Sequence, residues 1–265
     1  MFGGRADRLR HVKLYDLVIP LSSQLFSRLE TLTIAGARIS PDPSTNQIID
    51  VLRQCPELRP FELDYSGRVG IHASDTTVSE AEAVHLPLLA SFVVGLNNAV
   101  TFSRIISSVR VPACRRFILT CKDPTRSILS HESNDFITAV FSTIQRLPRI
   151  WLMFNAGGLS MSGHDNESEG MISILLSHSS PWEDLLSLIE HTAKSGPRPP
   201  INADMYCDLA LFPRLADILR RMLSITELKL TGSSNEYIAQ LSHRTLNDGK
   251  YEWILPNLKE LSLYD

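Results

Sequence analysis

The chain is poor in the residues that metal centres, disulfide frameworks and membrane segments need. Its 265 residues include only 4 cysteines, and positions 55, 114, 121 and 207 fit neither a zinc motif nor a disulfide scaffold. No apolar run approaches the roughly 18 residues that cross a membrane, and the polar first residues lack the apolar stretch of a signal peptide. We therefore expect no membrane partner, a cytoplasmic or nuclear location, and buried thiols at Cys55 and Cys114.

A large excess of charge and a catalytic pattern are also missing. The 26 Lys and Arg residues nearly balance 29 Asp and Glu residues, and a net charge of −3 is too mild to predict a nucleic-acid partner. The sequence has no phosphate-binding glycine loop and no pair of histidines at ligand spacing. Residues 158–163 lack the spacing of a nucleophile elbow, because Ser162 stands in place of the second glycine. We therefore expect no catalytic residue, no metal and no cofactor, and hence a protein that is not an enzyme.

What the chain does contain is a repeated phrase: an apolar residue, two variable residues, a second apolar residue, one variable residue and a third apolar residue. We call the three apolar positions anchors. Most copies begin about 20 to 33 residues apart, which is typical of leucine-rich repeats. The eight clear copies are Leu9/Val12/Leu14, Leu29/Leu32/Ile34, Leu58/Phe61/Leu63, Leu89/Phe92/Val94, Cys114/Phe117/Leu119, Leu147/Ile150/Leu152, Ile225/Leu228/Leu230 and Leu258/Leu261/Leu263.

This pattern predicts an α/β fold. We expect a leucine-rich-repeat solenoid, with a curved parallel sheet on its concave face and helices on its convex face. At 43% hydrophobic residues and without a break in composition, residues 1–265 are expected to form a single domain. It would contain about eight to ten irregular repeats. Both ends lack a polar repeat, so the natural caps are expected to be missing.

Between Leu147 and Ile225 the repeat pattern is weak. Two degenerate units are expected there, near residues 172–176 and 201–206, because the alternation of Ile172, Ile174 and Leu176 is typical of a half-buried strand. Residues 157–170 are rich in Gly, Ser, Asp and Glu and predict a solvated loop, with a binding loop as the alternative.

Helix and turn signals lie between the phrases. Ser44 and Gln47 predict a capping box ahead of an apolar helix face, and Ser180 to Glu183 predicts a second helix start. Apolar stripes at 136–144 and 215–222 predict two more helices. Prolines precede several phrases at a similar offset and are expected to end each helix before the next strand. They are Pro56, Pro87, Pro112, Pro148 and Pro256.

Residues between the anchors are the candidates for binding. Side chains alternate along a strand, so those between inward-pointing anchors are expected to face the concave surface. Their mixed signs favour a protein partner over a phosphate backbone. The candidate contact residues are Glu30, Thr31, Thr33, Arg59, Glu62, Arg115, Arg116, Ile118, Glu227, Lys229, Lys259 and Glu260, together with Ser262.

The phrases at residues 26–34, 111–117, 177–185 and 255–261 resemble the leucine-rich region of F-box proteins of basidiomycete fungi. The resemblance covers nearly the whole chain. It implies that the repeats recognise a target, while a separate amino-terminal F-box module docks on a cullin–RING ubiquitin ligase. Only eight residues precede Leu9, so the F-box module is absent and ligase docking is carried over to no residue here. The family expects an asparagine at the ninth position of each repeat. Here it appears at Asn97 and Asn155 but not in most repeats, so we expect an irregular solenoid.

These observations predict a non-catalytic protein–protein interaction module. The resemblance implies the target-recognition part of an F-box-like ubiquitin-ligase adaptor, with the ligase context depending on an F-box outside this chain. The alternative is a leucine-rich-repeat sensor or scaffold fragment without a ubiquitin-ligase link. The sequence does not identify the protein target.

Overall fold

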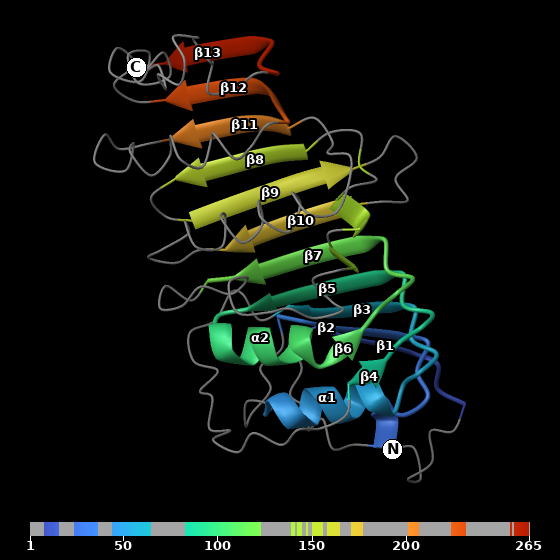
Figure 1. The fold of residues 1–265 in the computed structure, drawn as a ribbon. Helices are drawn as coiled ribbons and strands as arrows, with labels where there is room; N and C mark the ends of the chain where they lie inside the picture. Colours follow the sequence, from blue (N-terminus) through green and yellow to red (C-terminus); the bar gives the residue numbers. More distant parts are fainter. Residues whose placement is uncertain are drawn as a thin grey trace.

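One large sheet dominates the molecule (Figure 1). The computed structural model describes residues 8–15, 24–36, 44–64, 83–122, 139–140, 142–144, 147, 150–155, 158–164, 171–176, 201–206, 224–231, 255 and 257–264. In the order in which they pair, the 11 strands are β1 (His11–Tyr15), β2 (Thr31–Ala35), β3 (Pro60–Asp64), β5 (Ser91–Leu96), β7 (Arg116–Cys121), β10 (Met171–Leu176), β9 (Gly158–His164), β8 (Ile150–Asn155), β11 (Ile201–Tyr206), β12 (Ile225–Thr231) and β13 (Glu260–Tyr264).

The helices are few in the described part of the chain. They are the short 3₁₀ helix η1 (Gln24–Phe26) and the α-helices α1 (Thr45–Arg53) and α2 (Ala99–Ser107). Two short strands, β4 (Val84–His85) and β6 (Val109–Arg110), form a separate parallel pair. The fold is therefore mixed α/β, with a large, mostly parallel sheet. β1 and β13 lie at opposite ends of the stack of strands (Figure 1).

All eight phrases contribute a strand to this sheet, and the anchors of phrases that are neighbours in the sheet pair in register. Leu32 is the partner of Phe61, Phe61 of Phe92, and Phe92 of Phe117. The third anchors form a parallel row in the same strands: Ile34, Leu63, Val94 and Leu119. Every member of both rows is at most 2% exposed. The inward direction of the anchors is therefore confirmed for these strands.

The predicted chain order is wrong between β7 and β11. The repeat pattern placed β8 beside β7, but β10 pairs with β7 and β8 pairs with β11. Among the described strands β9 alone runs antiparallel, between β10 and β8. Asn155 pairs with Gly158, so two residues separate β8 from β9, a connection that antiparallel strands allow and parallel strands do not.

Part of the segment predicted as a loop is strand β9. Ser160 and Ser162 alternate with Met161 and Gly163, which are buried. Gly and Ser are uncommon in strands, so composition concealed the two-residue period. The two degenerate units are confirmed as strands: Ile172 and Ile174 of β10 are buried at 1% and 2% exposure, and residues 201–206 form β11.

The predicted capping box at the start of α1 is confirmed. The amide of Gln47 donates to Ser44 Oγ at 3.2 Å, and the amide of Ser44 donates to Gln47 Oε1 at 2.9 Å. Helix α2 was not predicted; its cap is Asn98, whose Oδ1 accepts from the Thr101 amide at 2.8 Å. Within the stripe at 136–144, residues 139–140 and 142–144 are helical. The helix starts expected at 180–183 and 215–222 lie outside the described residues.

Prolines shape the turns that lead into the strands. The amide of the first anchor donates to the carbonyl three residues earlier in the phrases at Leu58, Leu89 and Cys114, at 3.1, 3.3 and 3.1 Å. Pro56, Pro87 and Pro112 each occupy the second position of such a turn, where the fixed φ of proline fits. The expected handover from helix to strand is confirmed at Pro56, which follows α1, whereas the short strands β4 and β6 come directly before the turns at Pro87 and Pro112. Pro148 and Pro256 lie outside the described residues.

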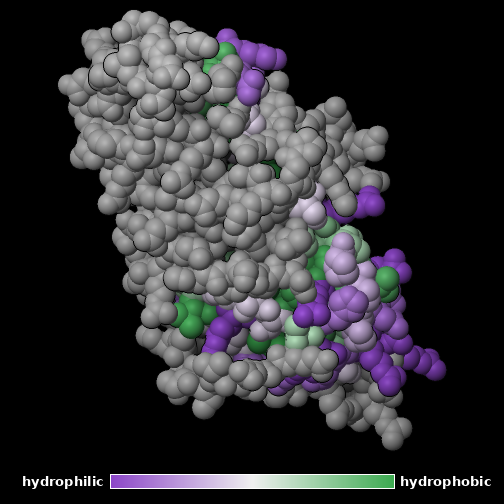
Figure 2. Space-filling view, viewed as in Figure 1, coloured by the Kyte–Doolittle hydropathy of each residue, from purple (hydrophilic) through white to green (hydrophobic). Residues whose placement is uncertain are grey.

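The buried anchors and the apolar residues of α1 and α2 form one core cluster. The face of the sheet turned away from these helices, which we call the helix-distal face, carries the residues between the anchors. The core is open at the β13 end, where Leu261 is 41% exposed although its partner Leu228 is 1% exposed. Figure 2 shows hydrophobic surface beside hydrophilic surface at that end of the molecule.

Leu32→Ala is expected to lower the free energy of unfolding by about 2–5 kcal/mol, because a fully buried leucine leaves a cavity when it is truncated. Leu261 occupies the same position of its phrase, and Leu261→Ala is the matched control, expected to cost much less because the side chain is 41% exposed. Urea unfolding followed by circular dichroism measures both. Equal losses in the two variants would contradict the proposed core.

Ser44→Ala is expected to cost about 1 kcal/mol of stability, because the amide of Gln47 then loses its acceptor. Ser44→Asp keeps an oxygen acceptor at the cap and is expected to retain most of the stability. The same unfolding measurement compares the two variants. A loss of equal size in both would show that the cap contributes little.

Candidate functional site

The helix-distal face is a continuous surface whose central row crosses every strand of the sheet. Register pairing joins one residue of each strand to the next along this row. The remaining pairings continue it to both ends of the sheet. The row consists of Lys13, Thr33, Glu62, Val93, Ile118, Ser173, Ser162, Trp151, Asn202, Glu227 and Glu260.

The structure brings most of the predicted contact residues to this side of the sheet or to its rim. Exposed members are Arg59, Arg115, Arg116, Lys229, Lys259 and Glu260, and half-buried members are Glu30, Thr31, Glu62, Ile118 and Glu227. Ser262 is also half-buried. The face therefore presents both signs of charge to solvent.

Four of these residues form a rim rather than the face itself. Glu30, Arg59, Arg115 and Lys259 each lie immediately before a strand. Their backbones continue the ladder: the amide of Arg59 donates to the carbonyl of Glu30 at 2.9 Å. Figure 2 shows hydrophilic surface gathered on the side of the molecule where the parallel strands begin in Figure 1.

Thr33, predicted as a contact residue, is the buried member of the set. Its exposure is 5%. Its register partners on the same face are Lys13 and Glu62. A short side chain flanked by two longer ones loses its accessible surface, so alternation alone overstates how available it is.

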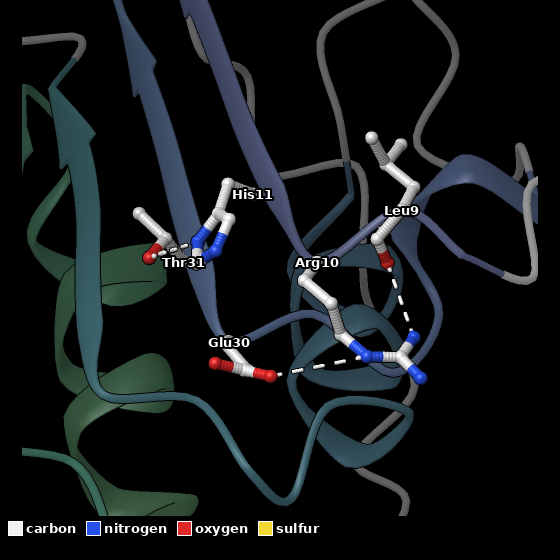
Figure 3. A network of polar contacts seen from close by, with 5 residues as sticks. All are labelled: Leu9, Arg10, His11, Glu30 and Thr31. Atoms are coloured by element: carbon white, nitrogen blue, oxygen red, sulfur yellow. Dashed lines mark hydrogen bonds and ion pairs between the residues drawn. The ribbon is translucent and has the colours of Figure 1, made fainter.

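At the β1 end the face is held by polar contacts between neighbouring strands (Figure 3). Arg10 Nε lies 3.8 Å from Glu30 Oε1, and an Arg10 guanidinium nitrogen donates to the carbonyl of Leu9 at 3.3 Å. His11 Nδ1 and Thr31 Oγ1 share a hydrogen bond of 3.0 Å. The side chains of Arg10 and Glu30 are 39% and 37% exposed, so this ion pair contributes little to stability. It orients Glu30 at the rim.

The other end of the face contains a pocket of about 390 Å³. Five strands line it: β8, β9, β11, β12 and β13. Four of its residues, Glu227, Lys229, Glu260 and Ser262, were predicted as contact residues. The described residues that line it are Trp151, Ser160, Ser162, Asn202, Ala203, Glu227, Leu228, Lys229, Glu260, Ser262 and Tyr264.

Contacts between neighbouring strands organise the pocket. Asn202 Nδ2 donates to Glu227 Oε2 at 2.6 Å, while Asn202 Oδ1 is buried without a hydrogen-bond partner. Lys229 Nζ lies over the ring of Tyr264, 4.8 Å from its centroid, a cation–π geometry. The pairing of β11 with β12 shifts by one residue beside Asn202, and such irregularities re-aim side chains.

Aromatic side chains flank the pocket at both ends. Trp151 is 40% exposed and stacks on His164, with ring centroids 5.4 Å apart and planes inclined by 28°. Tyr264 is 51% exposed. Exposed aromatic residues beside charged ones are enriched in the surfaces by which proteins bind partners. The prediction omitted Trp151, Asn202 and Tyr264, although the alternation rule places all three between or beside anchors.

The described cysteines serve packing. Cys55, Cys114 and Cys121 are buried and free of disulfides, which confirms the expectation for the first two. The Cys55 thiol donates to the carbonyl of Phe26 at 3.1 Å. Burial raises the pKa of Cys55, and it raises the pKa of Cys114 from 9.0 to about 12. A thiol with so high a pKa is neutral near pH 7 and a poor nucleophile.

The described parts of the chain contain no group of three or more His, Cys, Asp or Glu residues that could hold a metal ion. Within the same residues, no helix is long and apolar enough to span a membrane.

No protein-family model, no curated protein and no solved structure matches this chain. The proposal for its function therefore depends on the geometry of the helix-distal face and on the sequence pattern.

The raised pKa of Cys114 predicts a loss of stability in alkali. Below pH 9.0 the thiol is neutral in both folded and unfolded chains, and as the pH rises toward 12 the unfolded chain ionises first. At about pH 10.5 this thiol is expected to cost on the order of 2 kcal/mol relative to pH 8. Comparing wild type with Cys114→Ala at both values by urea unfolding isolates the effect. Parallel pH dependence in the two proteins would refute it.

Proposed function

We propose that this chain is a non-catalytic protein-interaction module of the leucine-rich-repeat type, which holds its target against the helix-distal face. The observation that carries the proposal is that all eight phrases contribute a strand to one sheet, with in-register anchors wherever two phrases are neighbours in it. In this proposal each strand and the segment after it form one repeat of a solenoid. Strand β9 is an insertion in the repeat series, and it lies between β10 and β8.

The size of the face supports a macromolecular partner. Eleven strands leave ten steps between them, which at about 4.8 Å each span roughly 48 Å, and five residues of strand span about 17 Å. The product is on the order of 800 Å², which is what one partner contributes to a standard protein–protein interface. The pocket alone, at about 390 Å³, occupies only one end of this surface.

The chemistry of the face supports a protein rather than a polyanion. Arg116 and Lys229 are exposed on this face, and so is the oppositely charged Glu260. A second carboxylate, Glu62 on β3, is half-buried. Alternating signs disfavour a phosphate backbone and allow register-specific pairing with a protein surface. The exposed aromatic residues Trp151 and Tyr264 are suitable anchors for such a partner.

The ubiquitin-ligase context is the finer part of the proposal and rests on the resemblance to fungal F-box proteins. Here the repeats select the target, and an F-box module outside this chain docks on the ligase. The alternative is a sensor or scaffold with the same binding face and no ligase. Co-purification of a cullin with the tagged gene product, expressed from the complete gene, supports the first proposal; its absence supports the second.

Two exposed arginines at the start of β7 give a direct test: Arg115 on the rim and Arg116 on the face. Arg115→Ala with Arg116→Ala is expected to reduce target capture about tenfold or more without unfolding the chain, because both side chains are exposed. Arg116 loses a hydrogen bond of 3.3 Å to Ser91 Oγ, a small cost at an exposed position. Affinity capture from source-cell extract, quantified by mass spectrometry, measures the effect.

The matched control removes the same charge from the helices, as Arg53→Ala with Arg104→Ala. It is expected to leave capture unchanged. Equal loss in both double variants would indicate a general charge effect. Melting of the Arg115/Arg116 variant would show that these side chains support the fold rather than the partner.

A further inference from the structure

The pocket at the β13 end contains a pair of like charges placed side by side. Glu227 and Glu260 are register partners on the neighbouring parallel strands β12 and β13, and both line the pocket. Neighbouring strands lie about 4.8 Å apart. Two carboxylates in this position repel each other and destabilise the strand pair. A cation bound between them removes the repulsion.

An amide side chain of the pocket supports one of the two carboxylates. Asn202 holds the Glu227 carboxylate in place, at 2.6 Å, and its own Oδ1 is buried without a partner. Among the described residues of the lining Lys229 is the one basic residue, and its ammonium lies over the Tyr264 ring, further along the strands than the two carboxylates. Two carboxylates against one ammonium give the lining a net negative charge near pH 7.

We propose that this pocket binds an arginine side chain of the partner protein, with its guanidinium between Glu227 and Glu260. The proposal rests on the proposed function, since it names the chemistry of the target segment that the face recognises. A guanidinium is planar and carries five donors, so its opposite edges serve two carboxylates at once. A lysine ammonium is a compact, strongly hydrated charge and does this less well.

A metal ion fits the pocket less well than a guanidinium. Hard divalent cations take six or more oxygen ligands, and no cluster of three or more acidic, His or Cys ligands exists among the described residues. The pocket volume of about 390 Å³ falls in the range of small-ligand sites. Trp151, two strands from Glu227 along the central row, offers an aromatic surface for the residues flanking the arginine.

Titration of the intact chain with the peptide acetyl-Gly-Arg-Gly-amide tests the proposal. The probe signal is the indole N–H resonance of Trp151 in a ¹⁵N-labelled sample, assigned with Trp151→Phe. The arginine peptide is expected to shift this resonance saturably, with a lysine peptide severalfold weaker and a citrulline peptide, which is neutral and of the same shape, without effect. Binding should weaken as salt increases.

Variants of the two carboxylates localise the binding. Glu260→Gln and Glu227→Gln are each expected to raise the dissociation constant about tenfold, because each removes a charge-assisted hydrogen bond while keeping the side-chain size. Glu57→Gln is the control, because Glu57 is an exposed glutamate outside both the pocket and the set of predicted contact residues. It should bind the arginine peptide as wild type does. Thermal unfolding of each variant confirms that it is folded.

The outcomes separate this inference from the proposed function. The arginine site is overturned if the arginine and citrulline peptides bind equally well, or if wild type and Glu260→Gln bind the arginine peptide equally well. This holds even where target capture still depends on Arg115 and Arg116. The reverse outcome combines two results: arginine binding is saturable and depends on Glu260, but no variant of the face alters target capture. That outcome upholds the pocket chemistry and overturns the proposed function.

Discussion

The structure depends on the contact between equivalent apolar anchors on neighbouring strands. Leu32, Phe61, Phe92 and Phe117 stand in one register row, and each is at most 1% exposed. Phe61 and Phe92 also contact each other, with ring centroids 5.7 Å apart. A shift of any strand by one residue would turn its anchors to the opposite face. The anchor row therefore fixes the register, and the register fixes which residues reach the helix-distal face.

The same constraint makes the helix-distal face continuous across the sheet. Its residues are held by backbone pairing between strands, so they need no loop to order them. Most of them can vary at little cost to the fold, since the anchors and the apolar residues of α1 and α2 form the core. At the β13 end this freedom allows two carboxylates, an ammonium and two aromatic rings to line one depression.

Much of this arrangement is predictable from the sequence because it depends on local periodicity. The phrases, the capping box of α1 and the proline turns each leave a pattern within a few residues, and each is found in the structure. Helix α2 was missed because its cap, Asn98, was not recognised as one. Trp151 could be predicted from the same alternation, because it stands between the anchors Ile150 and Leu152.

The order of β8, β9 and β10 could not be predicted in the same way. Which strand pairs with which is decided by contacts between distant residues, and the Gly- and Ser-rich β9 gives no sign that it pairs on both sides. Burial also depends on neighbours, as Thr33 shows: its position between anchors suggests exposure, while its register partners cover it.

The reversed meander has a consequence for how the chain assembles. In a simple repeat array each unit docks on the unit just before it, so order spreads along the chain from any starting point. Here β8 has no place beside β7; its partners are β9 and β11. Among the described strands of the large sheet, the block of β1, β2, β3, β5 and β7 and the block of β8 with β11 to β13 are joined through β9 and β10. Order that spreads by strand pairing from one block to the other therefore has to pass through these two strands.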